Sequence, residues 1–255
     1  MNDLRFHYTM RIFKLTILSL LILTIQTGCN KHEEHPPTTA QIESAGLQAL
    51  YAHQTAAIDQ LKSWAQQDMP IAQRELALAY RNWPTHESDA RFWLQKAANG
   101  GDCEAQFQLA EALYKGELEL KADHTNAGKW YETAAKAGNA KASFMLARMA
   151  KYGDGIPQDQ HLSIMWLMES SRNGNPQAMF LLSNAYAAGD GVDRNEMKAR
   201  EWLEKSAAGD YPVAIQALAM SLETGDMNNA GNATRARHLL KEASDERLMH
   251  WKNYQ

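Results

Sequence analysis

Few residues in this chain combine the type and the spacing that covalent or acid–base chemistry needs. Thr133 and Lys136 form a Thr-x-x-Lys pair, in which an amine one helical turn away could take the proton of a hydroxyl. The sequence contains no GxSxG, SxxK, HExxH or CxxC motif and no glycine-rich phosphate loop. Histidines are scattered through the repeats rather than clustered: His53, His86, His124, His161 and His238. We therefore predict that the protein is not an enzyme and needs no cofactor.

A run of metal-ligand side chains occurs near the N-terminus, at His32, Glu33, Glu34 and His35. It lacks the HExxH spacing that would orient two ligands on one helix. The surrounding residues, 29–40, carry charges and two prolines but no large apolar residue. This composition predicts a flexible tether with solvated charges and no metal site.

Cys29 stands at the end of a secretory signal. Arg5, Arg11 and Lys14 precede an uncharged run over residues 15–27, which ends in Gly28-Cys29. The run has 13 residues, whereas a membrane-spanning helix needs about 20. We therefore predict that residues 1–28 are a cleaved signal peptide and not a transmembrane anchor.

Gly28-Cys29 in this position resembles the bacterial lipobox, although Gln26 stands where that motif usually has leucine. The resemblance implies a diacylated Cys29 that anchors the protein to a membrane, and an ordinary cleaved signal is the alternative. Asn30 differs from the aspartate that resembles an inner-membrane retention signal. We expect a bacterial envelope lipoprotein, preferentially at the outer membrane, with its folded part in the periplasm.

Net charge and cysteine content bear on which partners and which disulfide bonds are possible. Loss of residues 1–28 removes three basic residues and one acidic residue, so the net charge changes from −4 to −6. An acidic chain argues against nucleic acid as a partner. With Cys29 acylated, Cys103 has no disulfide partner, and we predict it to be partly buried at the start of a helix.

A period of 36 or 37 residues dominates the rest of the chain. Its anchors are tryptophans separated by 37, 36 and 36 residues: Trp93, Trp130, Trp166 and Trp202. A further 37 residues lead to Leu239. Small residues precede these anchors by three positions: Ala90, Ala127, Ser163, Ala199 and Ala236. Alanines follow the tryptophans by 12 positions, at Ala105, Ala142, Ala178 and Ala214, and leucines by 16, at Leu109, Leu146, Leu182 and Leu218.

The offsets predict two helices in each unit. Ala90, Trp93 and Ala97 share one face of a first helix, as Ala105 and Leu109 do on a second. Glycines mark the turn between the helices: Gly101, Gly138 and Gly174, with Gly209 displaced by one residue. Glycines followed by an acid mark the end of the second helix: Gly116, Gly153, Gly189 and Gly225. We expect each tryptophan to fill the gap between neighbouring units.

Four segments carry a family resemblance: WLQKAANGGDCEAQFQLAEALYKGE, WYETAAKAGNAKASFMLARMAKYGDGIPQD, WLMESSRNGNPQAMFLLSNAYAAGDGVD and WLEKSAAGDYPVAIQALAMSLETGD. They resemble Sel-1-like repeats, which are relatives of tetratricopeptide repeats, over roughly residues 86–245. The resemblance implies an all-α fold, a right-handed α/α solenoid of two-helix repeats, whose concave surface receives a protein or peptide.

We divide the solenoid, residues 41–255, into three parts. A degenerate repeat over 41–85 lacks the tryptophan and the glycine, and we expect helices over 41–66 and 70–81 within it. Its Leu61, Ala72, Leu76 and Ala77 match positions of the next unit at a constant offset of 33. Clear repeats follow over 86–231, and a C-terminal cap over 232–255.

The segment 161–168, HLSIMWLM, is apolar nearly all round, whereas matching segments are amphipathic. We predict that Ile164, Met165 and Met168 belong to a partner-binding site, because methionine adapts to irregular partners. The alternative is that this helix is simply more enclosed than the others.

Two functions remain open for a repeat protein without catalytic motifs. One is an envelope adaptor that mediates protein–protein interaction. The other is an immunity protein that neutralises a secreted antibacterial effector, such as a type VI secretion phospholipase. The second is implied by resemblance, since periplasm-facing Sel-1-like lipoproteins often accompany such effectors.

Overall fold

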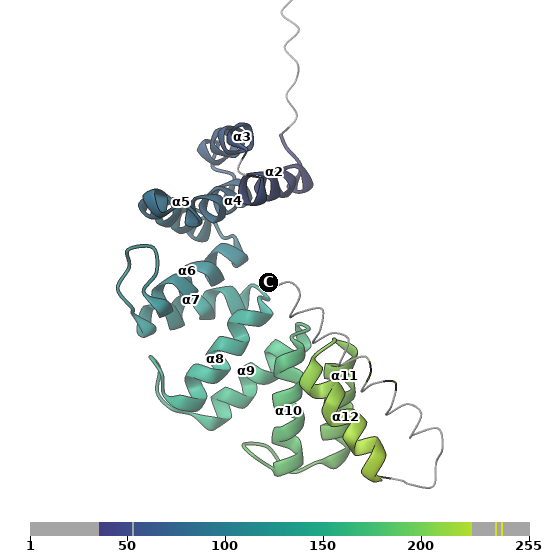
Figure 1. Ribbon diagram of the computed structural model, residues 1–255. Coiled ribbons are helices and arrows are strands. Elements are labelled where there is room, and N and C mark those ends of the chain that lie inside the picture. The colour runs from purple at the N-terminus through teal and green to yellow at the C-terminus, as the bar shows by residue number, and fades with distance from the viewer. Residues whose placement is uncertain (1–35, 53, 226–237, 239–240, 242–255) are drawn as a thin grey trace, which may run out of the picture. The chain divides into compact units, whose positions relative to one another are not determined.

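The computed structural model describes residues 36–225 except His53, together with His238 and Lys241 (Figure 1). The chain divides into two units, Met1–Thr38 and Thr39–Gln255, and the description below concerns the second. The predicted signal peptide, Cys29 and nearly all of the predicted cap over 232–255, with Ala236 and Leu239, lie outside the described residues. Within the described part, no helix has the length and apolar character that crossing a membrane requires.

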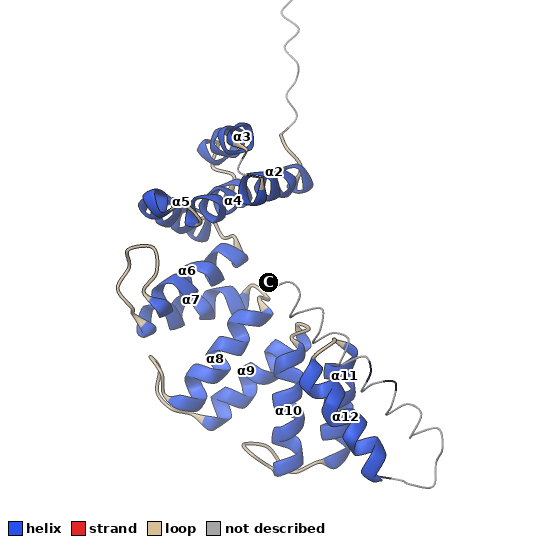
Figure 2. Cartoon of the chain, viewed as in Figure 1, coloured by secondary structure: helices blue, strands red, loops and turns tan. Residues whose placement is uncertain are grey.

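Helices and loops make up the described residues, which contain no strand (Figure 2). Four helix pairs follow one another along the chain: α5 (Glu87–Asn99) with α6 (Cys103–Lys115), α7 (His124–Lys136) with α8 (Ala140–Tyr152), α9 (Gln160–Arg172) with α10 (Pro176–Ala188), and α11 (Glu196–Ala208) with α12 (Pro212–Gly225). Each of these helices packs mainly on its neighbours in the chain. The fold is therefore the all-α solenoid that the period predicts.

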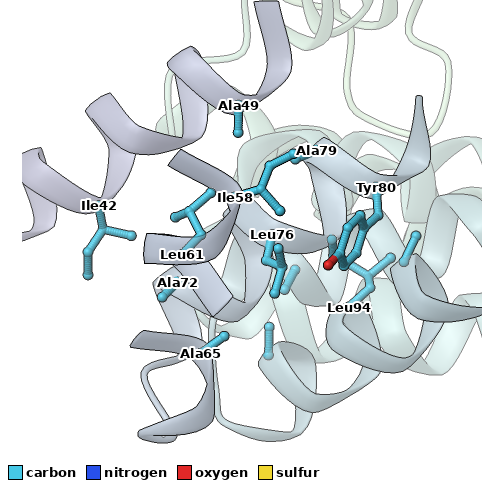
Figure 3. Packing of buried hydrophobic residues seen from close by; sticks show 14 of the residues in the cluster. Ile42, Ala49, Ile58, Leu61, Ala65, Ala72, Leu76, Ala79, Tyr80 and Leu94 are labelled. Carbon is cyan, nitrogen blue, oxygen red and sulfur yellow. The ribbon is translucent and has the colours of Figure 1, made fainter. Parts of the chain in front are cut away.

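The prediction of one helix over 41–66 is wrong, because the structure has two helices in this segment. Two helices, α2 (Thr39–Tyr51) and α3 (Thr55–Gln66), both pack against α4 (Pro70–Arg81), and a short 3₁₀ turn over Pro84–His86 leads to α5. One helix over 41–66 would be about 39 Å long at 1.5 Å per residue, roughly twice the length of α4. The break at 52–54 lets the apolar face of α2 fold back onto the core (Figure 3). The predicted helix over 70–81 is confirmed.

Aspartate or asparagine stands directly before every helix from α6 to α11 as its N-cap. Its side-chain oxygen accepts a hydrogen bond from the backbone N–H three residues later, which satisfies a donor that the helix leaves unpaired. These capping residues are Asp102, Asp123, Asn139, Asp159, Asn175 and Asn195. The caps recur with the repeat, so each unit starts its helices at the same positions.

The turn within each unit requires a residue in the left-handed region. Gly101, Gly138 and Gly174 supply it with φ values of 88°, 91° and 91°. In the last unit Asp210 takes that position with φ 58°, and the displaced Gly209 has φ −90°. Aspartate tolerates this conformation better than most residues, so the turn survives the shift of the glycine.

The predicted framework positions line the core. The alanines 12 residues after each tryptophan have no exposed surface, and the matching leucines are at most 3% exposed. Trp130 and Trp166 are half-buried, and each packs against two successive core clusters. These two tryptophans thus fill the gaps between units, as predicted. Figure 3 shows how Ile58, Leu61 and Leu76 meet in the first cluster.

Candidate partner-binding site

A hollow of about 430 Å³ opens between α7 and α9. Its apolar lining comes mainly from three α9 side chains, Leu162, Met165 and Met168, which we call the α9 stripe. Met165 is 54% exposed, and the other two are half-buried. Trp166 and Ala135 complete the apolar wall. The hollow therefore presents adaptable apolar side chains to an incoming molecule.

The opposite face of α9 is held firmly on its neighbours. Asp159 caps the helix by accepting a hydrogen bond from the Leu162 N–H at 3.0 Å. Ser163 Oγ donates to the Ala147 carbonyl at 2.8 Å, and Ser170 Oγ donates to the Ala140 carbonyl at 2.7 Å. Since these serines fix one face of α9 on α8, the stripe has to point away from that contact.

The repeat framework does not require apolar residues in the α9 stripe. The matching positions of α7 hold polar residues, Asn126, Lys129 and Glu132, and those of α11 hold Lys198, Glu201 and Glu204. These neighbouring helices fold and pack without apolar groups there. An apolar surface that packing does not need is a candidate for binding.

The rim of the hollow carries charges that already have partners. Lys136 Nζ lies 2.7 Å from Glu132, and Arg172 lies 3.5 Å from Glu169. Each pair lies within its own helix, α7 or α9, and its side chains are exposed. Such pairs contribute little to stability. With its charges balanced, the rim favours an apolar contact over recognition of a charged group.

The structure separates the three residues that the sequence grouped together. Met165 and Met168 line the hollow, but Ile164 is 3% exposed and packs in the core cluster of α8, α9 and α10. Leu162, which the sequence prediction omitted, joins the two methionines. The same comparison with polar residues at matching positions would have found it. Partner binding itself stays a prediction.

Thr133 and Lys136 of the Thr-x-x-Lys pair each have a partner other than one another. Thr133 Oγ1 donates to the Lys129 carbonyl at 3.0 Å, and Lys136 pairs with Glu132. Cys103 is the first residue of α6, free and partly buried, as predicted. In the described part of the chain, no group of three or more His, Cys, Asp or Glu side chains could hold a metal ion.

One histidine enters a cluster that the sequence prediction missed. His124 Nδ1 lies 2.5 Å from Asp154 Oδ1, and Tyr114 donates its hydroxyl to Asp154 Oδ2 at 2.5 Å. The rings of Tyr114 and His124 stack with centroids 4.4 Å apart. The hydrogen bonds from Tyr114 and then His124 lower the pKa of Asp154 below its ordinary value.

Other acids that follow a helix-ending glycine also form side-chain contacts. Asp154 follows a helix-ending glycine, and so do Glu117 and Asp190. Glu117 pairs with Arg81, and Asp190 accepts a hydrogen bond from Gln160 at 3.1 Å. Glu117 and Asp154 therefore join neighbouring units, whereas Asp190 joins the two helices of its own unit.

A family model described as Sel1 repeat matches the chain in five consecutive copies, at residues 87–102, 103–139, 140–175, 176–211 and 212–247. A search of curated proteins finds no match. The family match therefore rests on the repeats themselves.

Solved structures share this fold. A Sel1 repeat protein from Oxalobacter formigenes has a TM-score of 0.72 at 21% identity, over 88% of this chain and 93% of that one. The protein c5321, a protective antigen of uropathogenic Escherichia coli, has a TM-score of 0.68 at 23% identity, over 82% of this chain and 46% of that one. The immunity protein PA5088 from Pseudomonas aeruginosa has a TM-score of 0.53 at 16% identity, over 85% and 86%. At these identities the likeness shows the fold alone.

Proposed function

Since the chain belongs to the Sel1 repeat family, we propose that it is an adaptor that binds another protein through the α9 stripe. Sel1 repeat proteins mediate protein–protein interaction and are typically not enzymes. The observation that carries the proposal is the exposed apolar surface of Leu162, Met165 and Met168, where the neighbouring helices α7 and α11 carry polar residues.

The size of the stripe sets how much it contributes to binding. Burying the exposed half of Met165 removes about 100 Å² of apolar surface from water, which stabilises a complex by about 2.5 kcal/mol at 25 cal/mol per Å². Micromolar affinity corresponds to about 8 kcal/mol. The stripe is therefore the centre of a larger interface that also covers the charged rim formed by Lys136 and Arg172.

We further propose that the adaptor works at the bacterial cell envelope. Support comes from the N-terminal sequence, in which a signal-like run over 15–27 ends at Gly28-Cys29. Two acyl chains on Cys29 would hold the protein at the membrane, with the outer membrane favoured because Asn30 follows the cysteine. The partner is then a periplasmic protein or the exposed part of an envelope protein.

An immunity protein is the second candidate. The fold is shared with the protein titled immunity protein PA5088, which supports the candidate at the level of the scaffold. In this role, the stripe would cover a surface of a secreted effector. A strain that lacks this gene should then be killed by sister cells that deliver the effector. Survival of the deletion strain in that contact, and on periplasmic expression of the effector, would exclude immunity.

Replacing Met165 by glutamate tests the use of the stripe. Lysine and glutamate occupy the matching positions of α7 and α11, and the exposed Phe92 occupies that of α5, so Met165→Glu should fold normally. Met197→Glu is the matched control, because Met197 is 81% exposed on α11 and does not line the hollow. Affinity purification of tagged full-length chains with quantitative mass spectrometry should find partners depleted about tenfold or more in Met165→Glu and retained in Met197→Glu. Equal recovery from both variants would contradict the proposal.

A further inference from the structure

A second hollow, of about 390 Å³, lies between α8, α9 and α10. We call it the α8–α10 groove. Its floor is apolar and buried, with Ile164 3% and Leu167 7% exposed, and Ala185 lies beside them. The α8 wall presents two cations, Arg148 and Lys151. The groove is separate from the α9 stripe, since the two hollows have no lining residue in common.

Two residues that line the groove are smaller than their counterparts in the preceding unit, and one, Ile164, is larger than its counterpart Gly128. In the preceding unit, Tyr131 stands where Leu167 does, and Met149 stands where Ala185 does. Tyr131 has no exposed surface, and Met149 is 1% exposed, so both fill the space above α7. In the unit built on α9, Ile164 takes up part of the space that Met149 fills beside Gly128, and the exchange of Tyr131 for Leu167 leaves the rest as the groove.

The α8 wall also carries positive charge where the preceding unit carries none. Positions that match Arg148 and Lys151 hold Glu111 and Tyr114. Helix α8 contains no acidic residue, and α10 contains no charged residue at all. Neither Arg148 nor Lys151 forms an ion pair with any of the described residues. The carboxylate that lines the groove, Asp190, accepts a hydrogen bond from Gln160.

The α10 wall offers hydrogen-bonding groups that are not in use. The amides of Gln177 and Asn184 are exposed and have no hydrogen-bond partner within the described part of the chain. Leu181 lies between them and is 37% exposed, and Tyr152 across the groove is 69% exposed. A peptide backbone can pair with such amides while its side chains reach the apolar floor.

We propose that the α8–α10 groove binds an acidic segment of a protein partner. An apolar side chain of that segment lies on Ile164 and Leu167, in the volume that Tyr131 fills in the preceding unit. Carboxylates on either side of it lie next to Arg148 and Lys151. The chain carries a net charge of −4, so this basic wall attracts an acidic segment locally where the remainder of the protein repels it.

A labelled peptide of alternating Glu and Phe, measured by fluorescence anisotropy with the purified full chain, tests the site. Two reference peptides replace every Glu by Lys or every Phe by Ser. Saturable binding should be strongest for the acidic aromatic peptide, at least tenfold over either reference, and weaker at high salt. No saturation up to about 1 mM, or equal binding of the acidic and basic peptides, overturns the proposal.

Substitutions in the groove then test whether the peptide binds there. Ala185→Met adds a long side chain to the floor beside Ile164, and should weaken binding at least tenfold. The double variant Arg148→Glu and Lys151→Glu should do the same. Its charge-matched control is Lys121→Glu with Lys129→Glu, two exposed sites outside the groove.

The outcomes separate this site from the α9 stripe. Met165→Glu should leave peptide affinity unchanged, because Met165 does not line the groove. Loss of peptide binding in Met165→Glu or in the charge-matched control, or its retention in Ala185→Met, overturns the groove proposal without bearing on the adaptor function.

Discussion

Replacing Tyr131 by phenylalanine removes one buried oxygen atom and leaves the ring in place. The Tyr131 hydroxyl donates a hydrogen bond to Glu111 at 2.5 Å, and the tyrosine has no exposed surface. Hydrogen bonds to charged groups contribute about 1.5–3 kcal/mol. Glu111 keeps its ion pair with Lys115 at 2.6 Å, and its side chain is 15% exposed. We therefore expect a loss near the lower end, about 1.5 kcal/mol of unfolding free energy at pH 8.

The same substitution should change how stability depends on alkaline pH. Burial, followed by the hydrogen bond to Glu111, raises the pKa of Tyr131 well above its ordinary range. The folded protein thus keeps a proton that the unfolded chain loses at about pH 10. A raised pKa contributes stability below the unfolded value, and that contribution is lost as pH rises above it. At pH 11 the wild type should have lost about 1.4 kcal/mol through this group, so it should nearly match the variant.

Urea denaturation followed by tryptophan fluorescence and far-UV circular dichroism measures both effects. With a slope of about 2 kcal/mol per M, the midpoint should shift by roughly 0.7 M at pH 8. Tyr211→Phe is the control, since the Tyr211 hydroxyl has no hydrogen bond to the described residues, and should change stability by less than about 0.5 kcal/mol. The reasoning fails if Tyr131→Phe costs no more than the control, or if its cost is the same at pH 8 and pH 11.

Gly155→Ala should lower the melting temperature more than Gly138→Ala, although both glycines have positive φ. An added Cβ at Gly155 would lie 2.6 Å from a backbone carbonyl at the start of α7, whereas nothing lies within 4 Å at Gly138. Equal shifts in thermal unfolding would contradict this. Asp154→Asn should destabilise the protein at pH 7, because hydrogen bonds from Tyr114 and a histidine lower the pKa of Asp154. That stability is present above about pH 4 and is lost as pH falls through the lowered pKa, so denaturation curves of variant and wild type should converge in acid. Cys29→Ser should abolish incorporation of labelled palmitate in cells. Absence of label on the wild-type protein would contradict the prediction that Cys29 is lipidated.

Much of the fold follows from periodicity alone. The alanines and leucines that recur at constant distances after Trp93, Trp130, Trp166 and Trp202 are buried. The glycines of the first three units have left-handed backbones, whereas Gly209 does not. The N-terminal helices were less predictable. The apolar pattern of 41–66 is compatible with one helix, and no proline or glycine marks the break at 52–54. In the structure both α2 and α3 pack against α4, a tertiary contact that the local pattern of 41–66 does not show.

The candidate site was predictable in part. Met165 and Met168 differ from the polar residues at matching positions of α7 and α11, and this difference, with the adaptability of methionine, pointed to them. Ile164 differs in the same way, yet it is buried, because the hydrogen bonds of Ser163 and Ser170 orient α9 with that side against α8. Rotation of one helix about its axis is decided by such contacts and not by its composition.

The sequence by itself determined the two-helix repeat, since its period reflects a packing that each unit repeats with the next. Which apolar residues of α9 remain open was decided by the tertiary structure. The α8–α10 groove depends on whether the side chains of three helices together fill a common volume, and Leu167 and Ala185 leave it open where Tyr131 and Met149 fill it. Filling a volume is a property of all the surrounding residues at once, so it emerges only when the helices are packed.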